Sequence, residues 1–164
     1  MTNPDDLKQA KSVALKYLSR RNRSAHEVRE QLTKKGFSPP VIRETLDYLK
    51  KLNYVNDESF AQTWSRSRTQ TRKLGKRRLK QELLAKGLEP GLVGDTLKLV
   101  YSEVDELELA RDCAKKKLAG LKEMDVNKKR RRMAQFLARK GFDSATVYAT
   151  LKQLLGSSGD DLSE

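Results

Sequence analysis

The residue types that most often perform catalysis are scarce in this chain. It holds one histidine, His26, and one cysteine, Cys113. His26 lies on the expected surface of a helix, and Cys113 lies beside an apolar stripe with no histidine near it in the sequence, so neither has a partner that would activate it. These two residues cannot form the usual zinc site. We therefore expect a protein that is not an enzyme and that needs no metal and no cofactor.

Cations are the abundant chemical group. The 164 residues include 35 Lys and Arg against 22 Asp and Glu, which gives a net charge of +13. Such a field attracts polyanions, with nucleic acid the first candidate and an acidic protein or a membrane surface the second. Divided at residues 52 and 104, the three parts carry +6, +4 and +3. Charge spread in this way favours a long polyanion over a single small anionic ligand.

The densest cations form three clusters. We name them the N-terminal cluster, Arg20, Arg21 and Arg23; the central cluster, Arg66, Arg68, Arg72, Lys73, Lys76, Arg77, Arg78 and Lys80; and the C-terminal cluster, Lys128, Lys129, Arg130, Arg131 and Arg132. Clusters of this kind predict contacts to the phosphates of DNA or to acidic residues of a partner. The alternative is that they are solvated helix faces with no ligand.

A repeated segment shows which elements must position these clusters. The stretches EQLTKKGFSPPVIRETL, QELLAKGLEPGLVGDTL and QFLARKGFDSATVYATL share a leucine, a Lys-Gly pair and a Thr-Leu pair. Their Lys-Gly glycines, Gly36, Gly87 and Gly141, are 51 and 54 residues apart. A period of this size is typical of a repeated supersecondary unit.

Each copy reads as two helices joined by a glycine turn. In the first copy, Ser24 and Glu27 have the spacing of a capping box, Gly36 can take the left-handed conformation that ends a helix, and Ser38-Pro39 can begin the next one. Two short helices bury little apolar surface by themselves, and an amphipathic stretch before each copy supplies a third. The expected apolar faces of these stretches are Leu7, Ala10, Ala14, Tyr17 and Leu18 before the first copy, Phe60, Trp64 and Leu74 before the second, and Leu107, Ala110, Ala114, Leu118 and Leu121 before the third. There is no strand pattern.

The expected fold is therefore all-α, with three tandem three-helix repeats forming an elongated, curved array. We expect the repeats at residues 1–52, 53–104 and 105–155, and a disordered tail at 156–164. All three cationic clusters then fall at or near the start of the middle helix of their repeat. Stacked repeats would put them on one side of the array. Cations at a helix start oppose the helix dipole, so a purely structural purpose is less favoured.

Several motifs, in their order along the chain, resemble the RecX family, small bacterial modulators of the RecA recombinase. The motifs are Arg23-Ser24 with Glu27 and Leu32, then Asn56-Asp57-Glu58-Ser59-Phe60-Ala61, then Gly75, Gln81-Glu82-Leu83 and Lys86-Gly87. The resemblance covers residues 8–155. Asn53 stands where the family often has glycine, and asparagine tolerates the left-handed conformation. Asn56 stands where the family often has aspartate, and it remains a competent helix cap.

The resemblance implies a function that composition does not. Family members bind the recombinase filament on single-stranded DNA, lie along its helical groove, lower its ATP hydrolysis and block its extension and strand exchange, within recombination, DNA repair and the SOS response. We accordingly expect a RecA-type filament as partner, with single- and double-stranded DNA bound without sequence preference. The three clusters are the expected contact surface.

Two other hypotheses remain open. The protein could be a sequence-independent DNA-binding helical-repeat protein that acts without a recombinase, or a helical scaffold whose charge serves only solubility. We expect a monomer with no membrane partner. There is no run of about 18 apolar residues that could span a membrane. A start without an apolar core and a single cysteine indicate the cytoplasm.

Overall fold

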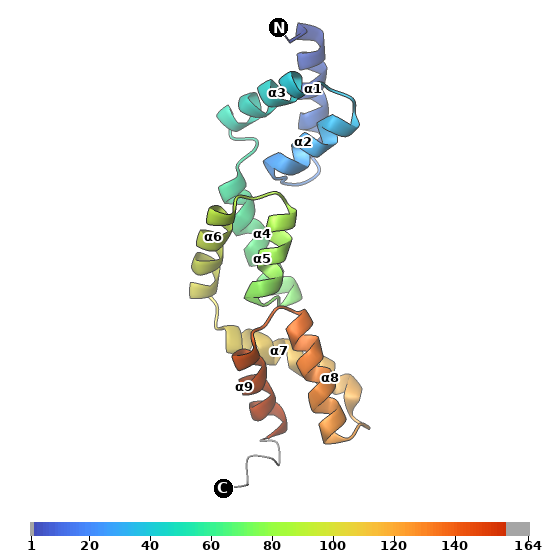
Figure 1. Cartoon of the computed structure of the whole chain (residues 1–164), viewed down its shortest axis with the longest axis vertical. Helices are drawn as coiled ribbons and strands as arrows, with labels where there is room; N and C mark the ends of the chain where they lie inside the picture. Colours follow the sequence, from blue (N-terminus) through green and yellow to red (C-terminus); the bar gives the residue numbers. More distant parts are fainter. Residues whose placement is uncertain (1, 157–164) are drawn as a thin grey trace. The chain divides into compact units, whose positions relative to one another are not determined.

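The computed structural model describes residues 2–156. Within that range the chain forms nine α-helices, one short 3-10 helix and no strand (Figure 1). The helices are α1 (Pro4–Leu18), α2 (Ala25–Lys34), α3 (Pro39–Lys51), α4 (Asp57–Arg72), α5 (Lys76–Ala85), α6 (Pro90–Ser102), α7 (Glu106–Leu118), η1 (Ala119–Leu121), α8 (Val126–Arg139) and α9 (Ser144–Leu155). The expected all-α fold of three-helix repeats is confirmed. Apart from Gly156, which ends α9, the tail lies outside the described residues.

The first repeat begins its middle helix as the sequence predicts. The Ser24 hydroxyl accepts a hydrogen bond from the Glu27 N–H at 3.2 Å, and the Glu27 carboxylate accepts one from the Ser24 N–H at 3.0 Å. This reciprocal pair is a capping box. The apolar stripe that follows, Val28 and Leu32, is fully buried in one cluster with side chains of α1 and α3. That burial, rather than helix propensity, holds the short helices together.

The Lys-Gly turns adopt the backbone conformation that the repeat requires. Gly36, Gly87 and Gly141 have φ of 85°, 76° and 98°, the left-handed region in which a side chain is strained. Asn53 also has a positive φ, 60°, so it takes the left-handed conformation that asparagine tolerates. The Asn56 side chain accepts a hydrogen bond from the Ser59 N–H at 3.0 Å, so it caps α4 as expected.

The buried stripes of α4 and α7 differ from the expected ones. On α4 the buried residues are Phe60, Ala61, Ser65 and Thr69, while Trp64 is half-buried. The reason is that small and hydroxyl side chains occupy the inner face, and the large indole lies beside it. On α7 the inner face is Leu109, Ala110, Cys113 and Ala114. Cys113 is therefore part of the third-repeat core, as a packing residue.

The described residues group into two compact units. One contains the chain up to Thr63 together with Leu83–Val93, and the other contains Trp64–Glu82 together with the chain from Gly94 onward. The first repeat lies within one unit and the third within the other. The middle repeat, α4 to α6, is shared between them, so each unit contains one junction between successive repeats.

The first junction explains the Lys-Gly pair of the second repeat. The Ser24 hydroxyl donates to the Lys86 carbonyl at 2.7 Å, and the Ala25 N–H donates to the Asp57 carboxylate at 2.8 Å. A Cβ placed on Gly87 would come closer than 3.0 Å to the His26 side chain. The start of α2 therefore lies directly against the glycine turn after α5.

The second junction has the same register. The Gly75 N–H donates to the Lys140 carbonyl at 2.8 Å, and the Lys76 N–H makes a longer contact of 3.5 Å to the Glu106 carboxylate. A Cβ on Gly75 would come closer than 3.0 Å to backbone atoms of Gly141 and Phe142. In both junctions, therefore, the Lys-Gly turn of one repeat covers the start of the middle helix of the repeat before it.

Candidate polyanion-binding surface

The N-terminal cluster mainly stabilises the start of α2. Arg21 donates to the Glu27 carboxylate at 2.6 Å, and the Arg23 guanidinium lies 4.0 Å from the centroid of the Tyr17 ring. Burial raises the pKa of Glu27, but hydrogen bonds from Arg21, Lys86 and the Ser24 backbone together hold that pKa below its ordinary value. Glu27 is therefore a buried carboxylate that anchors several cations. Arg20 is exposed.

The arginines of the central cluster are largely engaged within the protein. Arg66 pairs with Glu103 at 3.0 Å, and both side chains are about two-fifths exposed. Arg68 lies 3.1 Å from Glu82 and stacks 4.1 Å from the centroid of the Trp64 ring. An exposed pair such as Arg66 with Glu103 contributes little to stability, but each contact fixes where the guanidinium points.

Two further arginines of this cluster hold the second junction. Arg77 donates to the Ala138 carbonyl at 2.8 Å. The backbone of Arg78 lies where a Cβ on Gly141 would be, and its guanidinium is 3.9 Å from Glu82. The main contacts of Arg77 and Arg78 are therefore with the neighbouring repeat. Arg72, Lys76 and Lys80 are exposed.

The C-terminal cluster lies on α8, whose first N–H groups are capped by Asp125. Arg130 donates to the Gly156 carbonyl at 2.6 Å, whereas Lys128, Arg131 and Arg132 are exposed. We define the exposed cation set as the exposed members of the three clusters whose side chains make no hydrogen bond, ion pair or ring contact within residues 2–156, which are Arg20, Arg72, Lys80, Lys128, Arg131 and Arg132. Lys76 is excluded because its ammonium lies 5.5 Å from the centroid of the Tyr101 ring. This set is what the clusters offer most readily to an outside polyanion.

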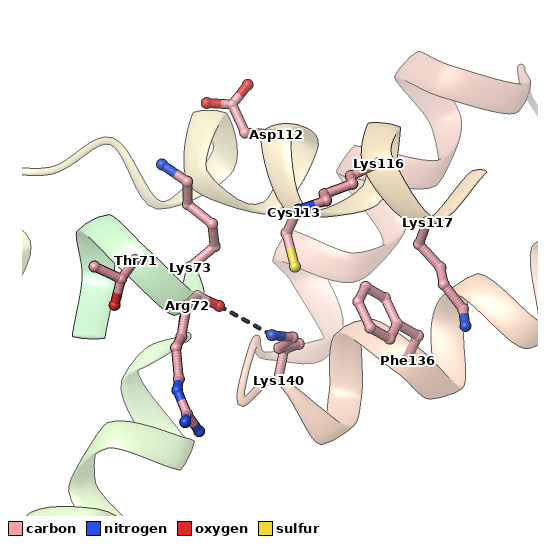
Figure 2. Close-up of a pocket in the computed structure, with 9 residues that line it drawn as sticks. All are labelled: Thr71, Arg72, Lys73, Asp112, Cys113, Lys116, Lys117, Phe136 and Lys140. Atoms are coloured by element: carbon pink, nitrogen blue, oxygen red, sulfur yellow. Dashed lines mark hydrogen bonds between the residues drawn. The ribbon is translucent and has the colours of Figure 1, made fainter. Parts of the chain in front are cut away.

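A cavity of about 540 Å³ lies between the end of α4, α7 and α8 (Figure 2). Its lining consists of Thr71, Arg72, Lys73, Asp112, Cys113, Lys116, Lys117, Phe136 and Lys140. We call it the basic cavity. Figure 2 shows the sulfur of Cys113 pointing into the space between Lys73, Lys140 and Phe136. Burial raises the pKa of the Cys113 thiol, and the nearby Lys140 and Lys73 only partly oppose that rise.

Sequence reasoning identified Arg72 and Lys73 of this cavity and missed the rest of its cations. Lys116 and Lys117 belong to a run of three lysines in the last turn of α7, where cations are expected for the helix dipole alone. In the sequence, Lys140 stands out only as part of the Lys-Gly turn. The run of three lysines was the available signal, but only the fold places it opposite α4.

Other kinds of site are not found in the part of the chain that the structure describes. Residues 2–156 contain no cluster of three or more side chains that could hold a metal ion. Among the same residues, no helix is long and apolar enough to cross a membrane.

Comparison with known proteins gives the same three-part organisation. Family models described as the first, second and third three-helix domains of RecX match residues 10–49, 56–97 and 103–151. The regulatory protein RecX of Streptomyces coelicolor is 32% identical over 96% of this chain and 83% of its own length. That of Chlorobium phaeobacteroides is 34% identical over 96% of this chain and 100% of its own length.

Solved structures agree with the sequence matches. The crystal structure of RecX from Lactobacillus salivarius superposes with a TM-score of 0.81 at 26% identity, covering 93% of this chain and 98% of that one. A second crystal structure, of a regulatory protein RecX, gives a TM-score of 0.79 at 26% identity, covering 91% of this chain and 72% of the other. The chain belongs to the RecX family of regulatory proteins.

Proposed function

We propose that this protein is a non-enzymatic regulator that binds a RecA-type recombinase filament on single-stranded DNA. In this proposal it inhibits the filament's ATP hydrolysis, extension and strand exchange, and so modulates recombination, DNA repair and the SOS response. It acts as a monomer in the cytoplasm. The observation that carries the proposal is the match to all three RecX domains in order along the chain.

The charge distribution supports contact with a nucleoprotein. The net charge is +13, and the exposed cation set has members in all three clusters. Cations held by internal carboxylates, such as Arg68 and Arg21, are poorer candidates because binding would have to break an existing pair. DNA phosphates, in single or double strands, and acidic residues of the recombinase are both suitable partners, and recognition through phosphates carries no sequence preference.

A comparison of two binding reactions tests the proposal. A fluorescently labelled copy of the protein is titrated with bare single-stranded DNA, and separately with the same DNA covered by RecA and a slowly hydrolysed ATP analogue. We expect tighter binding to the filament. Binding to bare DNA that is as tight as binding to the filament would contradict the proposal, and would favour a DNA-binding protein that acts without a recombinase.

A variant with every member of the exposed cation set changed to glutamine provides the matched test of the surface. It should lose filament binding while keeping its fold, since none of those side chains lies in a core cluster. The control changes the same number of exposed lysines outside the clusters, Lys8, Lys16, Lys34, Lys50, Lys98 and Lys152. Equal losses in both variants would mean that only net charge matters.

A further inference from the structure

The basic cavity has an excess of positive charge that the protein itself does not neutralise. Five of its lining residues are cationic and one is acidic, and the five are Arg72, Lys73, Lys116, Lys117 and Lys140. Within residues 2–156, none of the five forms an ion pair with a carboxylate at 4.0 Å or less. Figure 2 shows the one acidic side chain, Asp112, pointing away from the Cys113 sulfur. Like charges gathered in this way repel one another, and an anion in the cavity would relieve that repulsion.

The two repeat junctions differ at the equivalent lysine. In the first junction the Lys86 ammonium lies 2.9 Å from the Glu27 carboxylate. In the second, Lys140 occupies the same repeat position, but Arg78 stands where Glu27 would be. Lys140 instead donates to the carbonyl of Arg72 at 3.0 Å (Figure 2). The second junction thus has the lysine but not the carboxylate that neutralises the equivalent lysine in the first junction.

The backbone at the cavity's edge is strained. Lys73 has a φ of 52°, in the left-handed region where residues other than glycine are uncommon. Strain of this kind persists where the surrounding structure fixes it, and it gathers at binding sites. A glycine would take the same conformation without strain, so the lysine at this position costs stability.

An aromatic ring lies beside the cations. Phe136 is half-buried, and the ammonium groups of Lys117 and Lys140 lie 5.6 Å and 5.7 Å from its ring centroid. Cations next to a partly exposed aromatic ring are the combination that nucleic-acid sites use, in which phosphates meet the cations and a base stacks on the ring. The volume of about 540 Å³ falls in the range of roughly 300–1,000 Å³ typical of small-ligand sites.

We propose that the basic cavity binds one phosphate-bearing nucleotide unit, with the phosphate against Lys73, Lys116 and Lys140 and the base against Phe136. The unit comes either from a free nucleotide or from one nucleotide of single-stranded DNA. The second source rests on the function proposed above, and the first does not. Binding at this site would seat a nucleotide where the second and third repeats meet.

The test measures fluorescence anisotropy of a labelled short oligothymidylate and of an abasic oligonucleotide of the same length. Phe136→Leu keeps an apolar side chain but removes the ring, and Lys73→Gln removes one charge. The controls are Tyr148→Leu, an exposed aromatic on α9, and Lys98→Gln, an exposed lysine on α6. Thermal melting of each variant establishes that it is folded, and titration calorimetry with dTMP and ATP tests the free-nucleotide source.

Two results are expected. Phe136→Leu should weaken oligothymidylate binding by about fivefold or more, the lower end of what one stacked base contributes, and should leave abasic binding unchanged. Lys73→Gln should weaken binding of both oligonucleotides more than Lys98→Gln does. Calorimetric binding of ATP or dTMP that is lost in Phe136→Leu would assign the site to free nucleotides, and absence of such binding would assign it to DNA.

The proposal is overturned if Phe136→Leu and Lys73→Gln bind both oligonucleotides as their controls do. If those variants bind DNA normally but lose inhibition of the recombinase, the cavity instead takes an acidic segment of protein. Failure of the proposed function would look different. In that case the unmodified protein would have no effect on any recombinase filament, although the cavity variants would still lose nucleotide binding.

Discussion

The glycines of the repeat allow backbone strain to be separated from contact between repeats. Gly36 has a φ of 85° and open space where a Cβ would be, while Gly75 has no positive φ and a Cβ there would come within 3.0 Å of the backbone of Gly141 and Phe142. Gly141 combines a φ of 98° with a clash against the backbone of Arg78. The three alanine variants therefore test strain alone, contact alone and both together.

The expected magnitudes follow from these environments. Gly36→Ala should lower the free energy of unfolding by about 1 kcal/mol. A residue with a side chain in the left-handed conformation is destabilising by about 1–2 kcal/mol, and the reduced entropy of the unfolded chain offsets about 0.4–1 kcal/mol of this. Gly75→Ala should cost about 3 kcal/mol or more, since overpacking against backbone that cannot move aside costs about 1–3 kcal/mol and the 2.8 Å hydrogen bond from the Gly75 N–H to Lys140 is disturbed. Gly141→Ala should cost at least as much as Gly75→Ala.

Thermal and urea unfolding followed by far-ultraviolet circular dichroism provide the assay. At about 2–4 °C of Tm per kcal/mol for a chain of this size, Gly36→Ala should shift Tm by only a few degrees. Gly75→Ala should shift it about three times as far. Equal shifts for the two variants would refute the argument that the Lys-Gly turn of one repeat packs on the helix start of the one before it.

Three further predictions concern charge and the thiol. Glu27→Gln should destabilise the protein by about 1–3 kcal/mol at neutral pH, because charged hydrogen bonds from Arg21 and Lys86 are lost. The folded pKa of Glu27 lies below its ordinary value of 4.5, so the stability that its carboxylate contributes is present above pH 4.5 and is lost as the pH falls through the folded pKa. The urea midpoint of the variant should therefore fall less between pH 5 and pH 3 than that of the unmodified protein. An equal fall would argue against the pairing. Cys113 should react with iodoacetamide far more slowly in the folded protein than in urea, because burial raises its pKa and only the thiolate reacts; equal rates would show that the thiol is accessible. Replacing Lys80 and Arg131 with glutamine should reduce the slope of log K against log salt for single-stranded DNA by about 1.4 if both touch phosphates, at about 0.7 per contact; an unchanged slope would place the contacts elsewhere.

The sequence predicts the helices well because their signals are local. The capping pair Ser24 and Glu27, the glycine turn at Gly36 and the cap Asn56 each act within a few residues, and each is confirmed. The prediction of the buried residues was less accurate where small side chains form the inner face of a helix. On α4, Ser65 is fully buried while Trp64 is not, and hydrophobicity alone points to the wrong neighbour.

The candidate surface was less predictable because charge pairing is a property of the folded chain. Arg66 pairs with Glu103, and Arg68 pairs with Glu82. The sequence separation within each pair follows no rule that would have predicted the contact. The basic cavity joins Lys73 on one repeat to Lys140 and Phe136 on the next. No spacing rule within a single repeat brings those residues together.

ATP hydrolysis by a RecA-type recombinase on single-stranded DNA, with this protein added well below one copy per recombinase, tests the central claim most directly. We expect strong inhibition at such ratios, because a regulator that binds the filament can affect many subunits from few positions. Inhibition that appears only when the protein is sufficient to saturate the DNA would contradict the claim, and would indicate a competitor for DNA rather than a filament regulator.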